Sequence, residues 1–220
     1  MKANGLDILD KIHEPFNSLS HALGALLGFI GFAVLLYLSD GPLEYLGVTM
    51  FGVPLVFLYS MSALYHGLTV RKATRVVLRR LDQIGIYTLI AGTITPIALL
   101  VLEGYDRWIM MGLIWVFAFI GSVLIVRDPF ESSWVPTVIY LSMGWIPIVY
   151  FNQLIRGLST EALVWCVTGG LLYTVGAFVY LLEWPEPSSR SGRFGSHEIW
   201  HVFTLLASGS HYVLIGFYTL

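Results

Sequence analysis

Seven stretches of the chain are long and apolar enough to cross a lipid bilayer. A transmembrane helix needs roughly 20 mostly apolar residues, and the segments that qualify are about 20–38, 44–66, 81–102, 108–126, 134–151, 162–182 and 197–218. Hydrophobic residues make up 56% of the 220 positions and charged residues only 12%, whereas soluble domains are roughly 25% charged. The sequence therefore predicts an all-α integral membrane protein, a bundle of seven transmembrane helices.

The segments between these helices are short, so we expect one membrane domain over 1–220, in which helices adjacent in sequence are adjacent in space. An arm at 1–19 precedes the first helix, and a loop at 183–196 precedes the last one. Within that loop, 187–192 is rich in Pro, Ser, Arg and Gly and is expected to be flexible.

Lysine and arginine concentrate on one side of this predicted bundle. Ten of the twelve fall in the arm or in the loops after the second, fourth and sixth helices. These ten are Lys2, Lys11, Arg71, Lys72, Arg75, Arg79, Arg80, Arg127, Arg190 and Arg193. Because cytoplasmic loops are rich in basic residues, we expect a cytoplasmic N-terminus and an outside C-terminus, in the cell's inner (plasma) membrane. The formal net charge of −2 gives no reason to expect nucleic acid as a partner.

A pair of histidines opens the last predicted helix. His197 and His201 are four residues apart and therefore lie on one helix face, one turn apart. Three further ionisable groups, His21, His66 and Asp82, lie at helix ends that meet the same, cytoplasmic side of the predicted bundle. A helix rises only ~1.5 Å per residue, so all five groups can share one layer. Ionisable groups inside a membrane are costly and mark functional sites.

Three histidines and a carboxylate suit zinc, which takes nitrogen and oxygen ligands and keeps one position for water in catalytic sites. We expect His66, His197 and His201 to be ligands, with Asp82 bound to the metal or to its water. A carboxylate there would help deprotonate that water. Ser62, one turn before His66, is placed to hydrogen-bond the water or an oxyanion. Asp82 and Ser62 are therefore the candidate catalytic residues.

The remaining histidines have simpler interpretations. His13 lies on the polar arm, where we expect a hydrogen-bonded interface residue rather than a ligand. His21 is expected to pack against the metal site. For His211, deep in the last helix, we expect an interhelical hydrogen bond.

The segment 197–201 has the sequence HEIWH, which also matches the HExxH signature of zinc metalloproteases, with Glu198 as general base. No acidic residue follows Glu198 to serve as the third ligand of one such class. Thr204 and Ala207 stand where a second class has Gly and His. An intramembrane protease that takes Asp82 as a ligand is the version of this hypothesis that the sequence leaves open.

Four motifs follow one another along the chain: EPFNSLSH at 14–21, SALYH at 62–66, RLDQIGI at 80–86 and SHEIWH at 196–201. They resemble the ExxNxxSH motif, the SxxxH motif, the block opening helix three and the HxxxH block of the hemolysin III family. This family is the bacterial branch of the progestin and adipoQ receptor superfamily. The resemblance extends over nearly the whole chain.

The resemblance implies zinc bound by His66, His197 and His201, with Asp82 reaching the metal through water. Adiponectin receptors have glutamine at the position that matches Glu198, which implies that Glu198 is not a catalytic base. We expect Glu198 to be a solvated or interface side chain. The superfamily also resembles alkaline ceramidases, which implies zinc-dependent hydrolysis of a lipid amide.

Three functional hypotheses follow. The first is a zinc hydrolase of a membrane lipid amide or ester, with a role in membrane lipid homeostasis. The second is a non-enzymatic sensor or regulator whose structural zinc ties helices two, three and seven together, and a closed four-ligand site would favour it. The third, a pore-forming hemolysin, is disfavoured because the polar groups cluster at one end of the bundle and form no continuous stripe.

Overall fold

The computed structural model of the protein describes residues 12–127, 134–186 and 194–220, and within these ranges every regular element is a helix. The elements are α2 (Pro15–Leu38), α3 (Pro42–Gly67), α4 (Lys72–Val101), α5 (Asp106–Arg127), α6 (Trp134–Trp145), a 3-10 helix (Ile146–Tyr150), α7 (Phe151–Gly157), α8 (Thr160–Leu181), α10 (Ser196–Leu214) and a π-helical turn (Ile215–Thr219). With α6, the 3-10 helix and α7 taken as one span, seven helices are long and apolar enough to cross a membrane. The predicted seven-helix membrane bundle is thus confirmed.

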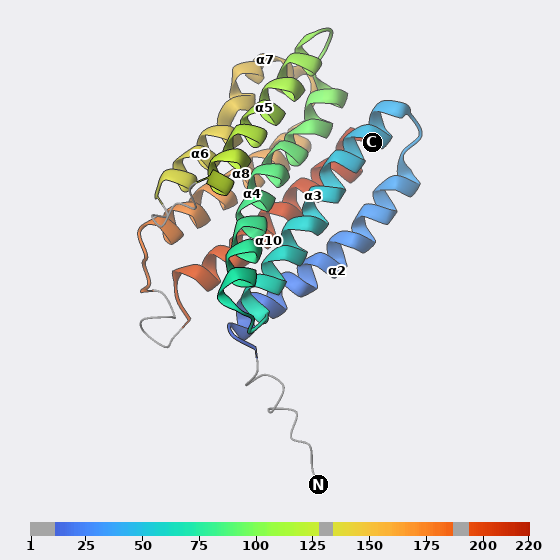
Figure 1. Cartoon of the computed structure of the whole chain (residues 1–220). Coiled ribbons are helices and arrows are strands. Elements are labelled where there is room, and N and C mark those ends of the chain that lie inside the picture. Colours follow the sequence, from blue (N-terminus) through green and yellow to red (C-terminus); the bar gives the residue numbers. More distant parts are fainter. Residues whose placement is uncertain (1–11, 128–133, 187–193) are drawn as a thin grey trace.

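Helices adjacent in sequence pack side by side from α2 through α5, and α10 returns to pack against α8 and α2 (Figure 1). The start of α2 and the end of α10 lie at opposite ends of the bundle, as an odd number of crossings requires. Which end faces the cytoplasm stays a prediction. Four of the basic residues behind it, Lys2, Lys11, Arg190 and Arg193, lie outside the described residues, as does the predicted flexible loop at 187–192.

Two helices begin earlier than the apolar segments indicated. Helix α2 starts at Pro15, because proline is favoured in the first turn, where its missing N–H has no helical partner. Helix α4 starts at Lys72, so Arg75 and Arg79 lie on a helix rather than in a loop. Arginine and lysine are good helix formers, and their long side chains let a helix extend past the apolar layer while the charges stay in water.

The fifth span is interrupted. The sequence predicted one helix over 134–151, but α6 ends at Trp145 and a 3-10 turn leads into α7, which continues to Gly157. Pro147 lies in this turn and has no N–H to donate to the preceding turn, so the α-helical ladder is broken here.

Helices α3 and α4 approach each other closely through two glycines of α4. An alanine Cβ at Gly92 would lie 2.3 Å from the carbonyl oxygen of Met50, and one at Gly85 would lie 2.9 Å from the Cα of Leu58. Small residues at such contacts let membrane helices pack backbone to backbone. This contact sets the spacing between α3 and α4, which both contribute residues to the site described next.

Replacing Gly92 with alanine is expected to lower the free energy of unfolding by about 1–3 kcal/mol, because the added methyl must displace backbone. Gly112 on α5 is the matched control, since an added Cβ there meets nothing within 4 Å. Gly112→Ala should be neutral or slightly stabilising. Thermal unfolding of both variants in detergent micelles measures the difference, and equal stability of the two would contradict the tight contact.

Candidate metal centre

Three imidazoles meet at one end of the bundle. His66 comes from the last turn of α3, and His197 and His201 come from the first two turns of α10. One ligand nitrogen from each ring lies within 4.8 Å of the others. His66 and His201 are each only 2% exposed, and His197 is half-buried. The structure therefore brings together the three histidines predicted from the sequence, in an arrangement that could hold a metal ion.

One nitrogen of His66 is engaged by its neighbour Glu14, which directly precedes α2. A carboxylate oxygen of Glu14 lies 2.6 Å from Nδ1 of His66. Burial acts to raise the pKa of Glu14, but the hydrogen bond and electrostatic attraction of His66, together with the hydrogen bond from Asn17, outweigh it and lower the pKa to about 2. An ionised carboxylate only accepts hydrogen bonds, so Nδ1 of His66 donates. Its Nε2 is then available to a metal, which is the arrangement of known carboxylate–histidine–metal sites.

The chain around Glu14 is tied to the end of α3 by its backbone. The N–H of Glu14 donates to the carbonyl of His66 at 2.9 Å, and the N–H of His13 donates to that of Gly67 at 3.3 Å. The imidazole of His13 itself lies 3.3 Å from Glu14 and is well exposed. It lies outside the metal-ligand group, by which we mean the three candidate ligands His66, His197 and His201. The segment before α2 thus clasps the helix end that carries His66.

Glu198 is placed differently from our expectation of a solvated or interface side chain. It is only 6% exposed, and its carboxylate accepts the N–H of Gly195 at 2.9 Å, which caps the start of α10. The side-chain amide of Asn17 donates to Glu14 at 2.9 Å and makes a longer contact of 3.5 Å with Glu198. Glu198 is therefore a buried capping residue that links α10 to α2. This use of its carboxylate does not favour the protease interpretation.

His21 packs against the metal-ligand group without belonging to it. Its ring stacks on that of His201 with centroids 3.8 Å apart, and its Nε2 lies 3.4 Å from the hydroxyl of Thr204. This agrees with the predicted packing role. His211 makes its hydrogen bond within its own helix, to the carbonyl of Ala207 at 3.1 Å. The expected interhelical hydrogen bond of His211 was therefore wrong.

Asp82 and Ser62 form a pair beside the histidines. The Ser62 side chain is 1% exposed and interacts with the carboxylate of Asp82. Both residues line the same cavity as His197 and His201. Asp82 does not belong to the group of mutually close ligand atoms. The geometry therefore places Asp82 next to the metal-ligand group rather than inside it.

The hydrogen bonding of two buried nitrogens indicates whether this site fits a metal. Within the described ranges, Nε2 of His197 and Nδ1 of His201 have no hydrogen-bond partner. Buried polar atoms are nearly always paired, and leaving one unpaired costs about 1–3 kcal/mol. A cation held between the rings would offset this cost, and imidazole nitrogens are good ligands for zinc and other transition metals. The residues therefore fit a metal ion.

A cavity of about 420 Å³ extends from this site into the bundle between α4, α6, α8 and α10. Its wall includes Asp82 near the metal-ligand group and Ile97 further along α4. These two residues are separated by about 22 Å of helix, at ~1.5 Å per residue. Most of the wall between them is apolar, with Ile86, Ile90, Ile94 and Leu163 among the lining side chains. The site thus opens into a long, mostly apolar space.

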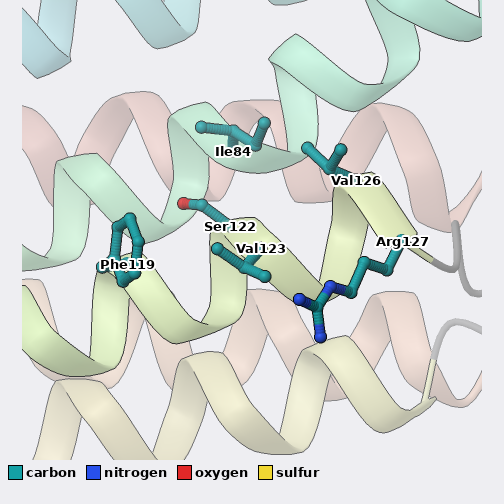
Figure 2. A pocket seen from close by; sticks show the side chains of 6 residues that line it. All are labelled: Ile84, Phe119, Ser122, Val123, Val126 and Arg127. Carbon is teal, nitrogen blue, oxygen red and sulfur yellow. The ribbon is translucent and has the colours of Figure 1, made fainter.

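A smaller hollow of about 240 Å³ lies on α5, closed on one side by Ile84 of α4 (Figure 2). Apart from Ser122 and Arg127, the side chains around it are apolar. The Ser122 hydroxyl donates to the carbonyl of Ala118 in its own helix. The hollow contains none of the histidines, and we assign no function to it.

The sequence alone indicates no role for Glu14 and Asn17, although both contribute to this site. Both belong to the first of the four motifs, so the pattern pointed to them. Their contacts with His66 and Glu198 depend on how α2 meets α3 and α10, which no spacing along the chain reveals.

Comparisons with known proteins show the family of this chain. The family model described as "Haemolysin-III related" matches residues 9–212. The chain is 32% identical to Hemolysin-3 of Bacillus cereus, covering 94% of this chain and 92% of that protein. It is 27% identical to the human monocyte to macrophage differentiation factor, covering 92% and 82%. A 26% match to the adiponectin receptor protein of Drosophila melanogaster covers 92% of this chain and 50% of the receptor. The chain is therefore a multi-pass membrane protein that belongs to the hemolysin III family.

Proposed function

We propose that His66, His197 and His201 hold a zinc ion and that the protein hydrolyses an amide or ester bond of a membrane lipid, as a part of membrane lipid homeostasis. The observation that carries this proposal is the shared cavity. Two of the metal-ligating histidines and the Asp82–Ser62 pair line the same mostly apolar space. A lipid carbonyl at the metal end of this cavity would have its acyl chain in the apolar remainder.

The set of groups favours a catalytic over a structural metal. Three histidines around one ion leave a coordination position open, as catalytic zinc sites do. The structural-zinc hypothesis calls for a fourth protein ligand, and the described residues supply three mutually close ones. When bound, zinc supplies Lewis acidity, which polarises a carbonyl and lowers the pKa of a water to about 7.

Asp82 has the position of the proton carrier. Its carboxylate lies beside the histidines and faces the cavity. It accepts a proton from the attacking water as the water oxygen bonds to the acyl carbon. It then gives that proton to the leaving nitrogen or oxygen as the scissile bond breaks, so a free fatty acid and an amine or alcohol result. A positioned carboxylate that moves a proton in this way typically contributes about 10²–10⁴-fold in rate.

Ser62 and Glu14 position the groups that do this chemistry. The interaction of Ser62 with Asp82 helps to orient the carboxylate. Ser62 also lines the cavity, where its hydroxyl can hydrogen-bond an oxyanion of the bound lipid. Glu14 fixes the ring of His66 through the 2.6 Å contact at Nδ1 and raises its basicity toward a metal.

Lipid turnover in reconstituted vesicles tests the proposed activity. Purified wild-type protein is incorporated into vesicles that contain an N-acyl sphingolipid or an ester phospholipid, and released fatty acid is measured. We expect Asp82→Asn to reduce release about 100- to 10,000-fold, because the proton carrier is lost. His66→Ala should reduce it to background. Glu44→Gln is the control, since Glu44 only caps the far end of α3. Equal release by wild type and His66→Ala for both lipid classes would rule the activity out.

Metal affinity tests the role of Glu14 independently of turnover. Glu14→Gln keeps an acceptor for His66 but removes the charge, and we expect zinc affinity to fall about 10- to 100-fold. Competition with a chelator of known affinity measures the change, and Glu44→Gln again serves as the matched control. An unchanged affinity in Glu14→Gln would show that the contact with His66 does not tune the site.

A further inference from the structure

The cavity has a second polar position, well away from the metal-ligand group. His211 and Tyr173 both line the cavity, from α10 and α8. His211 follows His201 by ten residues on the same helix, which corresponds to about 15 Å. Neither residue takes part in the proposed hydrolysis. A polar side chain this deep in a membrane protein marks a candidate binding site.

The hydrogen bond of His211 determines what its free nitrogen can do. Nδ1 lies 3.1 Å from the carbonyl oxygen of Ala207. A carbonyl only accepts, so Nδ1 carries the proton. In a neutral imidazole the other nitrogen, Nε2, is then an acceptor. Among the described residues no donor reaches this Nε2.

A chain of hydroxyl groups fixes the proton of Tyr173 in the same way. Tyr59 donates its single proton to the carbonyl of Thr204 at 3.0 Å. For all three contacts of this chain to be hydrogen bonds at once, Ser208, 2.7 Å from Tyr59, is the donor in that pair. Tyr173, 2.8 Å from Ser208, must in turn donate to Ser208. Each hydroxyl has one proton, so the oxygen of Tyr173 has only acceptor capacity left.

Two other hydroxyls of the cavity wall donate their protons to backbone carbonyls of their own helices. Thr93 donates to the carbonyl of Leu89 at 2.8 Å, and Thr174 donates to that of Gly170 at 2.7 Å. They offer no proton to the cavity. The cavity wall therefore has two hydrogen-bond acceptors, at His211 and Tyr173. Neither of these threonines has a proton left to donate to them.

The two acceptors are held side by side by packing. The rings of Tyr173 and His211 are stacked, with centroids 5.9 Å apart and planes at 21°. Gly169 of α8 leaves the space that the imidazole fills, since a Cβ there would lie 2.3 Å from Cε1 of His211. The pair is thus a defined feature of the wall and not a loosely placed polar group.

We infer that His211 and Tyr173 form a subsite for a hydroxyl group on the chain of a bound lipid, about 15 Å from the metal end. A lipid hydroxyl donates to one of the two acceptors, whereas a plain acyl chain leaves both unpaired in an apolar space. This inference rests on the proposed function in one respect, that a lipid chain occupies the cavity. It selects hydroxylated chains among the lipids that fit.

The single cysteine of the chain provides a probe. Cys166 lines the cavity, so a bound chain should slow its reaction with a maleimide. Protection is measured in detergent with stearate, with stearate hydroxylated at mid-chain and with stearate hydroxylated next to the carboxylate. We expect half-protection by the mid-chain alcohol at about a 3- to 10-fold lower concentration than by the other two, the effect of one net hydrogen bond. Cys166→Ala gives the background labelling.

Two variants assign the preference to the subsite. Tyr173→Phe keeps the ring and removes the oxygen, and His211→Phe keeps a ring and removes the acceptor nitrogen. Each should reduce the preference for the mid-chain alcohol and leave protection by stearate unchanged. Equal protection by all three ligands in the wild type would overturn this inference and leave the proposed function standing. No protection by any ligand would overturn both.

Discussion

The structure brings three imidazoles together at one end of the bundle, in an arrangement that could hold a metal ion. His66, His197 and His201 are brought within a few ångströms of one another, and two of their buried nitrogens lack hydrogen-bond partners in the described structure. Such an arrangement is costly unless a cation compensates it. The contacts of α2 with α3 and α10, through Glu14 and Asn17, hold the rings in this position.

The cavity beside the three histidines is the feature that suggests a function for them beyond joining helices. A metal buried among helices with no space beside it would only join them. Here the space beside it runs about 22 Å along α4 and is mostly apolar. It has a carboxylate and a hydroxyl at the metal end and two acceptors further along. The same wall therefore suggests where a lipid carbonyl, its acyl chain and a chain hydroxyl would lie.

Much of this architecture could be predicted from the sequence, because membrane helices obey a strong length and polarity rule. The seven spans and the pairing of His197 with His201 on one helix face follow from hydropathy and helical spacing, and the position of His66 beside them follows from the predicted topology. Glu198 was misplaced because its role as a cap depends on the loop before α10 and on Asn17 of α2. The break in the fifth span has a local cause, the missing N–H of Pro147. The cavity depends on side-chain packing between distant helices, which periodicity along one helix does not report.

The central claim is that three histidines of this chain hold a zinc ion. X-ray absorption at the zinc edge of the purified, detergent-solubilised protein tests it most directly. The account predicts bound zinc with three imidazole nitrogens at about 2.0–2.1 Å and the remaining position filled by oxygen. A protein that retains no zinc when purified without chelator, or a spectrum without imidazole scattering, would contradict it.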